Sequence, residues 1–280
     1  MIPIYENLRG RSAAITGGSG VLSSAMAREL GRQGVNVAIL SRRRDSGEKV
    51  AQEIVDAGGV AASFSCDVTS HESIAMAHEE IVGRFGACEI LINGAGGNLS
   101  EAITSDEVFD TLSGGVDRSL FDLDIDAIKE VIDLNLIGTI AASKIFAKAM
   151  IGLNGATIVN ISSMSAFSPL TKIPAYSASK AGVNNFTSWL AVYLAKSQIR
   201  VNAIAPGFFL TTQNRSLLTN EDGTLTARSK KIISSTPMNR FGEPSELLGT
   251  LLWLLDEELS GFVTGVTIPV DGGFMAYSGV

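Results

Sequence analysis

The sequence predicts a single α/β domain over residues 1–280, built on a doubly wound parallel sheet of about seven strands with helices on both faces. Short apolar runs alternate along the chain with longer segments of helical periodicity. The runs are nearly continuous rather than interrupted by polar residues, which is typical of parallel strands that are buried on both faces. A glycine-rich turn follows the first run, and no repeat or low-complexity linker divides the chain.

The predicted strands are the short apolar runs Ser12–Thr16, Val35–Leu40, Ala61–Cys66, Glu89–Asn93, Thr157–Ser162, Ile199–Ile204 and Val266–Val270. The predicted helices are the longer segments Ser24–Gln33, Ser46–Ala57, His71–Phe85, Ile125–Leu153, Ala178–Lys196 and Pro244–Leu255. Parallel neighbours must be joined by right-handed crossovers, and the helix in each crossover covers one face of the sheet.

Two long excursions, residues 97–126 and 208–237, interrupt this alternation and are rich in polar residues. Both follow the carboxyl end of a predicted strand, which is where an open α/β sheet binds its ligands. Long loops inside a compact domain are usually functional. We therefore expect 208–237 to act as a substrate lid, whereas 97–126 is explained equally well as a lid or as a surface insertion or oligomer contact.

The composition excludes several classes of protein. Apolar residues make up 45% of the chain, which is too much for an intrinsically disordered protein. The net charge of −7 argues against nucleic acid or an anionic membrane surface as a partner. The two cysteines, Cys66 and Cys88, and the two histidines lack the spacing of a metal site, so we expect no metal. Because no secretory signal and no apolar tract long enough to span a bilayer is visible, we expect a cytoplasmic protein.

The turn Thr16–Ser23 follows the first predicted strand and opens a helix. Its glycines, Gly17, Gly18 and Gly20, let the backbone approach a pyrophosphate, while the helix N-terminus directs N–H groups at the anion. A tight strand–helix turn needs glycine in any case, so glycines alone specify no ligand. Their position within a strand–helix–strand unit predicts a dinucleotide site.

The end of the second predicted strand bears on the choice of dinucleotide. An acidic residue there accepts hydrogen bonds from the ribose of NAD, whereas arginine accommodates the 2′-phosphate of NADP. Here Ser41 is followed by three arginines, Arg42, Arg43 and Arg44, before the first acid, Asp45. Such a run is also found in solvated turns, but it favours NADP(H), with NAD(H) kept as the alternative.

Tyr176 and Lys180 are four residues apart at the start of a predicted helix. Residues at this spacing share a helix face, so we expect the ammonium beside the phenol, where it lowers the pKa of the tyrosine. Ser163 follows a buried strand at its carboxyl end, where its hydroxyl can polarise a carbonyl. Each element alone is common, but together with a nucleotide loop they supply a proton donor, its activator and a carbonyl-binding group.

On these motifs the chain resembles the short-chain dehydrogenase/reductase family over nearly its whole length. The matching segments are Thr16–Ser23, Cys66-Asp67-Val68, Asn93-Gly94-Ala95-Gly96, Asn135-Leu136-Ile137-Gly138, Ser163, Tyr176-x-x-x-Lys180, Pro206-Gly207 and Val270-Asp271-Gly272-Gly273. The resemblance implies a Rossmann fold and hydride transfer between a nicotinamide cofactor and an alcohol or ketone. It also implies a homotetramer.

The resemblance further implies roles for individual residues. Tyr176 is the implied general acid/base, Ser163 orients the carbonyl oxygen, and Lys180 lowers the pKa of Tyr176 and holds the nicotinamide ribose. Asn135 is implied to support a water-linked proton relay to Lys180. The implied cofactor-binding residues are Gly17, Ser19, Gly20, Val21, Leu22, Ser41, Arg42, Arg43, Asp67, Val68, Asn93, Gly94, Ala95, Tyr176, Lys180, Pro206, Gly207 and Thr211.

Within the family, several segments are similar to the D-mannonate oxidoreductase (fructuronate reductase) subgroup. They are Gly20–Ala27, Asn93–Asn98, Phe121–Asp124, Ala205–Thr211 with Gln213–Arg215, and Ala276–Val280. This similarity implies a sugar-acid substrate, D-fructuronate or D-mannonate, although gluconate 5-dehydrogenases share part of the pattern. The candidate substrate-binding residues are Asn98, Lys172, Gln213, Asn214 and Arg215. The two cations among them would face the substrate carboxylate, and each is explained equally well as a solvent-facing loop residue.

The chain departs from the family pattern at four positions. Val21 and Ser23 stand where the phosphate loop usually carries glycines, so the turn must be built differently. Gly94 stands where a second asparagine is common, and Ser41 replaces an acid that the subgroup often has. The last difference supports NADP(H).

Two other functions are compatible with the same motifs. One is a reductase of a different carbonyl compound, such as a steroid, an acyl-thioester or a cyclic diketone. The other is a nucleotide-binding regulator that has kept the fold and lost turnover. Retention of Ser163, Tyr176 and Lys180 argues against the regulator.

Overall fold

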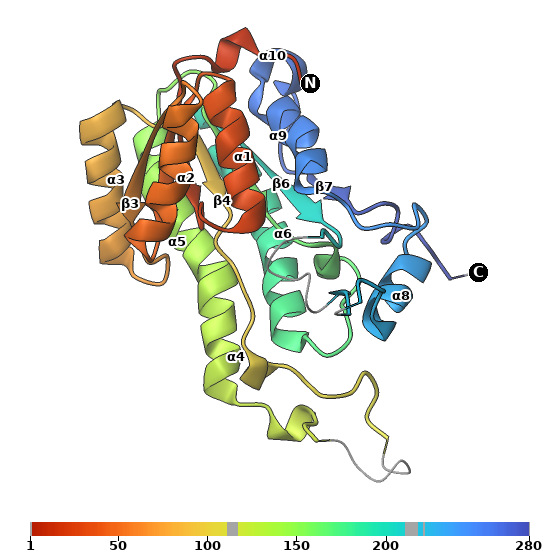
Figure 1. The fold of residues 1–280 in the computed structure, drawn as a ribbon. Helices are drawn as coiled ribbons and strands as arrows, with labels where there is room; N and C mark the ends of the chain where they lie inside the picture. Colours follow the sequence, from red (N-terminus) through yellow and green to blue (C-terminus); the bar gives the residue numbers. More distant parts are fainter. Residues whose placement is uncertain (1, 111–116, 211–217, 221, 280) are drawn as a thin grey trace.

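A computed structural model describes residues 2–110, 117–210, 218–220 and 222–279 (Figure 1). Its centre is one parallel sheet of seven strands in the order β3-β2-β1-β4-β5-β6-β7. The strands are β1 (Ser12–Thr16), β2 (Asn36–Ser41), β3 (Val60–Ser65), β4 (Ile90–Asn93), β5 (Thr157–Ile161), β6 (Arg200–Pro206) and β7 (Thr267–Val270). Each of the predicted strands is present, and the doubly wound α/β fold is confirmed.

The chain enters the sheet at its centre. β1 pairs with β2 on one side and with β4 on the other, so that Thr16 has both Leu40 and Asn93 as partners. The chain first builds outward to β3 and then returns to β4, from which it builds outward to β7. The strand order reverses between β1 and β4, and doubly wound sheets bind their ligands at the carboxyl ends of the strands at this point.

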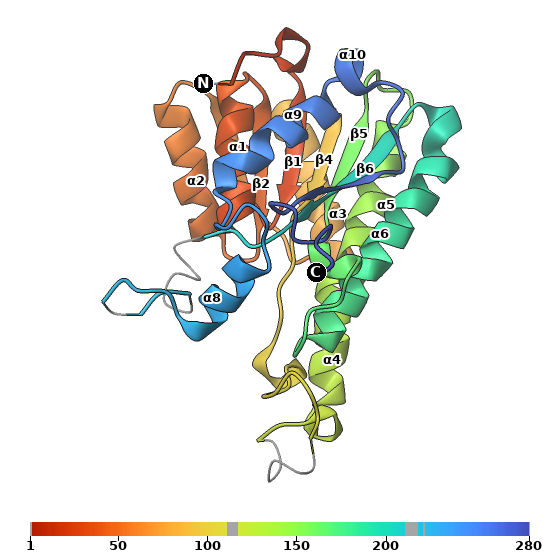
Figure 2. The same ribbon diagram turned by 90° about the vertical axis from the view of Figure 1, so that its right-hand side faces the viewer.

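Helices cover both faces of the sheet (Figure 2). α1 (Val21–Arg32), α2 (Arg44–Asp56) and α9 (Leu248–Leu255) pack on one face, and α3 (His71–Phe85), α5 (Gly138–Met150) and α6 (Pro174–Leu194) pack on the other. The remaining helices are α4 (Ile125–Ile132), α8 (Ala227–Ser234) and α10 (Glu257–Ser260). Short 3₁₀ turns occupy Glu6–Leu8, Ser100–Ala102, Leu120–Asp122, Met164–Ala166, Ala195–Ser197 and Pro244–Leu247.

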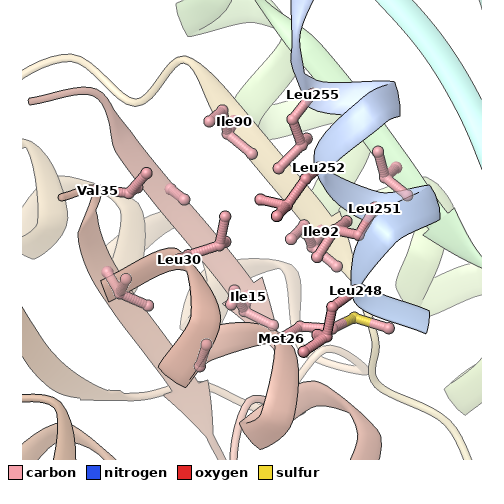
Figure 3. Packing of buried hydrophobic residues seen from close by; sticks show 14 of the residues in the cluster. Ile15, Met26, Leu30, Val35, Ile90, Ile92, Leu248, Leu251, Leu252 and Leu255 are labelled. Carbon is pink, nitrogen blue, oxygen red and sulfur yellow. The ribbon is translucent and has the colours of Figure 1, made fainter. Parts of the chain in front are cut away.

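Each face of the sheet has its own apolar core. Ile15 of β1, Ile92 of β4 and Leu251 of α9 belong to the first core (Figure 3). Ala14, which points to the opposite face, belongs to the second core with α3, α5 and α6. Because alternate residues of a central strand enter alternate cores, most of its positions are apolar or small, and burial of each large apolar side chain contributes about 1.5–3 kcal/mol.

Several predicted helix boundaries are wrong. Residues 125–153 do not form one α-helix, because α4 ends at Ile132 and a π turn, Asp133–Ile137, precedes α5. α6 begins at Pro174, four residues earlier than predicted, since proline suits the first turn of a helix. Pro244–Leu247 is a 3₁₀ turn before α9, and neither α8 nor α10 is predicted.

The two excursions leave the carboxyl-end edge of the sheet and approach each other beside it (Figures 1 and 2). An ion pair joins Glu107 of the first excursion to Lys231 of α8 in the second. The first excursion also contacts the segment before α6, because Lys172 donates a hydrogen bond to the carbonyl of Ser105 (2.6 Å) and accepts one from the N–H of Thr104 (3.0 Å). None of the described helices is both long and apolar enough to cross a membrane.

Candidate active site

The carboxyl end of β5 and the first turns of α6 bring Ser163, Tyr176 and Lys180 together. The hydroxyl groups of Ser163 and Tyr176 are hydrogen-bonded to each other. The Lys180 ammonium lies 5.7 Å from the centre of the Tyr176 ring and donates a 2.8 Å hydrogen bond to the carbonyl of Ile161. Lys180 is only 4% exposed, so its charge is held inside the protein at the base of the site.

Local structure fixes each of these side chains. Tyr176 is the third residue of α6 and Lys180 the seventh, so they lie one turn apart on one face of the helix. Ser163 follows β5 and caps the 3₁₀ turn Met164–Ala166 by accepting a 3.2 Å hydrogen bond from the N–H of Ser165. The Ser165 hydroxyl donates a second hydrogen bond to the same oxygen at 3.0 Å.

Burial sets the protonation of the site. It lowers the pKa of Lys180 to about 8, because a charged ammonium is poorly solvated inside the protein. Burial also raises the pKa of Tyr176, and the hydrogen bond with Ser163 opposes that increase. At neutral pH the phenol is therefore protonated and can donate a proton. The expectation that Lys180 lowers the pKa of Tyr176 stays a prediction.

Asn135 lies in the π turn between α4 and α5, a type of helix irregularity that is frequent at functional sites. Its side-chain nitrogen donates hydrogen bonds to the carbonyls of Gly97 and Val131, both at 2.7 Å, and its side-chain oxygen accepts one from the N–H of Gly97 at 3.2 Å. Its backbone carbonyl accepts a hydrogen bond from Thr139 (2.9 Å). The structure thus fixes Asn135 beside the loop after β4, and its role in a proton relay stays a prediction.

Residues 94–97, which follow β4, connect the glycine-rich turn to the lysine. At one end, the N–H groups of Gly94 and Ala95 donate to the side-chain oxygen of Thr16 at 3.1 and 3.2 Å. Near the other end, a Cβ on Gly96 would lie 2.7 Å from the side-chain oxygen of Asn135 and 3.3 Å from the ammonium of Lys180. We call residues 94–97 the β4 bridge.

The glycine-rich turn fits a pyrophosphate. Gly17 has a φ of +61°, and a Cβ there would lie 2.7 Å from the Cα of Ala95, so no larger residue fits. Gly20 caps α1 without a side chain, which leaves the first N–H groups of the helix, near Val21 and Leu22, available to an anion. Ser19 lies in the same turn.

The structure explains two departures from the family pattern together. Ser23 is buried in the first turn of α1, and its side-chain oxygen would lie 2.4 Å from a Cβ placed on Gly94. The same Cβ would lie 2.9 Å from the backbone carbonyl oxygen of Thr16, so the β1 backbone and Ser23 together favour glycine at 94.

On the adenosine side, the structure brings Arg42 close to Asp67 and leaves Arg42 and Arg43 exposed. Hydrogen bonds from Thr69 lower the pKa of Asp67, and the charge of Arg42 lowers it further. The side chain of Ser41 is buried, and its hydroxyl donates to the carbonyl of Arg43 at 2.8 Å. The buried Ser41 side chain therefore stabilises the turn at residues 41–43.

Two further predicted cofactor residues direct their side chains into the protein interior. Asn93 donates hydrogen bonds from its side-chain nitrogen to Ser143 (2.9 Å) and Asn160 (2.8 Å), so it joins β4 to β5 and α5. Val68 is buried against Gly138, where a Cβ would lie 2.8 Å from it. Only the backbone of these residues is left to face a bound nucleotide.

The predicted nicotinamide side follows β6. Gly207 donates to the carbonyl of Val270 at 2.9 Å, and a Cβ on Gly207 would lie 2.6 Å from the Cα of Asp271. Pro206 ends β6, whereas Thr211 lies outside the described residues.

Beside this segment is a pocket of about 350 Å³, which the sequence did not predict. Its lining includes Phe208, Met238, Arg240, Glu246 and Asp271.

The candidate substrate residues are described only in part. Lys172 has a φ of +72°, a strained conformation of the kind that clusters at functional sites, and its ammonium bonds the Ser105 carbonyl in the first excursion. Asn98 is half-buried, and its side-chain oxygen accepts a hydrogen bond from the N–H of Leu99. The other three candidates, Gln213, Asn214 and Arg215, lie outside the described residues.

Comparison with known proteins places this geometry in context. The family model for short chain dehydrogenases matches residues 11–222. A Bacillus subtilis protein named "Uncharacterized oxidoreductase UxuB" is 57% identical over 280 residues, which cover 100% of both chains. Glucose 1-dehydrogenase 2 of the same organism is 32% identical over 276 residues and covers 98% of each chain.

Among solved structures, that of a "putative D-Mannonate oxidoreductase" from Haemophilus influenza with bound NAD has a TM-score of 0.93. It is 50% identical, with 98% of each chain covered. The match to the family model and the convergence of serine, tyrosine and lysine in this structure agree. The chain belongs to the short chain dehydrogenase family and is an oxidoreductase.

Proposed function

We propose that the protein interconverts a ketone and a secondary alcohol on a sugar acid, with D-fructuronate and D-mannonate as the substrate pair. The observation that carries the reaction type is the contact of the Ser163 and Tyr176 hydroxyls beside a buried Lys180. The sugar acid is supported by the 50% identity to a structure described as a "putative D-Mannonate oxidoreductase".

In this proposal the chain moves a proton while the bound nicotinamide supplies or accepts the hydride. During reduction, the Tyr176 hydroxyl gives its proton to the carbonyl oxygen, and the Ser163 hydroxyl donates a hydrogen bond to the same oxygen. Lys180 places a positive charge close to the tyrosine that has lost its proton. In oxidation the same groups act in reverse, so Tyr176 takes the proton of the alcohol.

The glycine-rich turn, the α1 N-terminus and the β4 bridge would hold the dinucleotide, with Asp67 at the adenine and Lys180 at the nicotinamide ribose. NAD(H) is supported by the NAD bound in the Haemophilus structure. The exposed Arg42 and Arg43 favour NADP(H), as the sequence predicts, because their guanidinium groups can pair with a 2′-phosphate. We propose that the enzyme accepts both.

Recognition of a sugar acid requires a cation for its carboxylate. Lys172 lies four residues before Tyr176, and its ammonium already meets a carbonyl oxygen of the first excursion. The hydrogen bond with Lys231 lowers the pKa of Glu107, and the nearby charge of Lys172 lowers it further. In our proposal Lys172 and Arg215 bind the carboxylate, and Asn98, Gln213 and Asn214 bind hydroxyl groups.

We also propose that the protein works as a homotetramer in the cytoplasm. An apolar surface on α6 supports association, since Trp189, Val192 and Tyr193 are 56%, 80% and 69% exposed. Light scattering coupled to gel filtration would test the assembly. A monomer would contradict it.

One experiment tests the activity. Initial rates would be measured with NADH and NADPH against fructuronate, tagaturonate, 5-ketogluconate and neutral ketones. The proposal predicts the highest kcat/KM with fructuronate. A higher value with 5-ketogluconate would favour a gluconate 5-dehydrogenase, and a higher value with a neutral ketone would exclude the sugar-acid assignment. Dinucleotide binding without turnover of any compound would favour the non-catalytic regulator.

A further inference from the structure

A continuous series of polar contacts joins the end of β5 to α6. Four consecutive residues, 160 to 163, each contact a different side chain of the helix. The four contacts are Asn160 with Thr187, Ile161 with Lys180, Ser162 with Asn184, and Ser163 with Tyr176. We call them the β5–α6 ladder. Two of the four involve the proposed catalytic residues directly, and the other two have no role in the reaction described above.

The contact between Ser162 and Asn184 lies between the two contacts that involve proposed catalytic residues, those of Ile161 with Lys180 and of Ser163 with Tyr176. The Ser162 hydroxyl donates a 2.5 Å hydrogen bond to the side-chain oxygen of Asn184 and lies 3.4 Å from the backbone carbonyl oxygen of Lys180. Ser162 is 2% exposed, and its N–H donates to the carbonyl of Ile204 in β6 at 2.8 Å. Its backbone is therefore fixed in the sheet, while its side chain reaches the helix.

The helix face gives this contact its significance. Tyr176, Lys180 and Asn184 are spaced four residues apart, so they lie along one side of α6. If α6 rotated or slid against β5, all three side chains would move together. A hydrogen bond that fixes Asn184 therefore also fixes the positions of Tyr176 and Lys180.

We propose that Ser162 and Asn184 are positioning residues for the reaction. Their hydrogen bond holds α6 in the register in which the Lys180 ammonium meets the Ile161 carbonyl and the Tyr176 hydroxyl meets that of Ser163. This inference rests on the proposed function, because it assumes that Tyr176 and Lys180 take part in turnover. A hydrogen bond shielded from water is stronger than an exposed one, and leaving one partner unpaired there is costly.

Three variants and a double variant test the proposal. Ser162→Ala and Asn184→Leu each remove the hydrogen bond, whereas Asn184→Asp keeps an oxygen that accepts it. We expect the first two to lower kcat about tenfold and the Tm by about 2–4 °C, with the KM for the dinucleotide little changed. We expect Asn184→Asp to retain most of the wild-type kcat. Since the two residues act through one contact, the double variant Ser162→Ala/Asn184→Leu should have about the same kcat as the less active of the two single variants.

If Asn184 contributed to packing alone, the two Asn184 variants would have the reverse order of kcat. An apolar leucine would then be tolerated and a carboxylate would be harmful, so a kcat higher in Asn184→Leu than in Asn184→Asp would overturn the proposal. Additive losses in the double variant, or an unchanged kcat in Ser162→Ala, would also overturn it.

The matched control is Ser188→Ala. Ser188 lies on the same helix, but its hydroxyl meets the carbonyls of Asn184 and Gly265 at 3.3 and 3.2 Å, on an exposed part of the helix. We expect an unchanged kcat. All rates are measured with whichever ketone the wild-type protein reduces best. A preference for a neutral ketone would then contradict the sugar-acid proposal and leave the test of positioning intact.

Discussion

The ammonium nitrogen of Lys180 lies 2.8 Å from the carbonyl oxygen of Ile161, in a part of the protein that solvent hardly reaches. Burying an ammonium is costly, and one backbone carbonyl compensates only part of the lost hydration. The pKa of Lys180 is consequently lowered to about 8. The charge of this residue therefore changes close to physiological pH.

The first prediction concerns pH. We expect kcat/KM for ketone reduction to be steady below about pH 7 and to fall as the pH rises through about 8, because the Lys180 ammonium is present only below its pKa. Lys180→Arg stays charged throughout, so any activity that it retains should not fall in this range. A pH–rate profile measures both. A wild-type profile that is flat around pH 8 would contradict the assignment.

Replacing Tyr176 with phenylalanine should abolish the proton transfer without disturbing the cofactor. We expect kcat for Tyr176→Phe to fall by about 10²–10⁴-fold, since the proton donor is lost. The Kd for the dinucleotide, measured by nucleotide fluorescence, should stay within about twofold of wild type. Tyr193→Phe on the same helix keeps the ring that stacks on Trp189 and should behave as wild type. Substantial turnover in Tyr176→Phe would rule out this residue as the acid.

Gly17→Ala should impair dinucleotide binding. The new Cβ would lie 2.7 Å from the Cα of Ala95 and would occupy a backbone with positive φ, so the turn must move. We expect the Kd to rise at least about tenfold, with a loss of about 1–2 kcal/mol in stability. Gly58→Ala is the control, because Gly58 also has positive φ but open space around its Cα. It should lose stability and keep its affinity.

Lys172→Gln tests recognition of the carboxylate. Glutamine preserves much of the side-chain length and removes the charge, so the KM for an acidic sugar should rise about tenfold or more. The KM for a neutral ketone should change little. If both KM values rise equally, Lys172 acts by anchoring Ser105 and the first excursion instead.

His78 should make stability depend on pH. Within the described residues its Nε2 is buried without a hydrogen-bond partner, and the ring meets Phe146 edge-on with 4.9 Å between centroids. Burial lowers the pKa of His78 below its ordinary 6.5. The unfolded chain therefore takes up a proton first as the pH falls through about 6.5, and the folded state loses stability from there downward.

The Tm should accordingly drop between about pH 7 and pH 5. His78→Leu should reduce that drop, and the exposed His71→Leu should not. Equal drops in wild type and His78→Leu would assign the effect to other groups.

Much of the fold could be predicted because the central strands face two cores. Ala14 and Ile15 enter opposite cores, so both faces of the run that contains them favour apolar residues, and such runs are easy to recognise. The π turn at Asp133–Ile137 could not be predicted, because one extra residue in a turn barely alters the spacing of apolar residues. α8 was missed for the opposite reason, as most of its residues are polar.

The site could be predicted in its residue types but not in its contacts. The spacing of Tyr176 and Lys180 is visible in the sequence, since a helix converts spacing into proximity. The hydrogen bonds of Lys180 to Ile161 and of Ser162 to Asn184 join segments about 20 residues apart. They depend on how α6 packs against the sheet, which the local pattern does not determine. No signal in the sequence distinguishes Asn184 from its neighbour Asn185.

The β4 bridge has a mechanical consequence. Its first two N–H groups are fixed to Thr16 in the glycine-rich turn, and Gly97 is fixed to Asn135 by hydrogen bonds in both directions. The span that joins the phosphate-facing half of the candidate site to the proton-transferring half is therefore only four residues long, and hydrogen bonds fix both of its ends. Since no flexible segment lies between these ends, a displacement of the glycine-rich turn would move residues 94–97 together and so would reach the surroundings of Lys180.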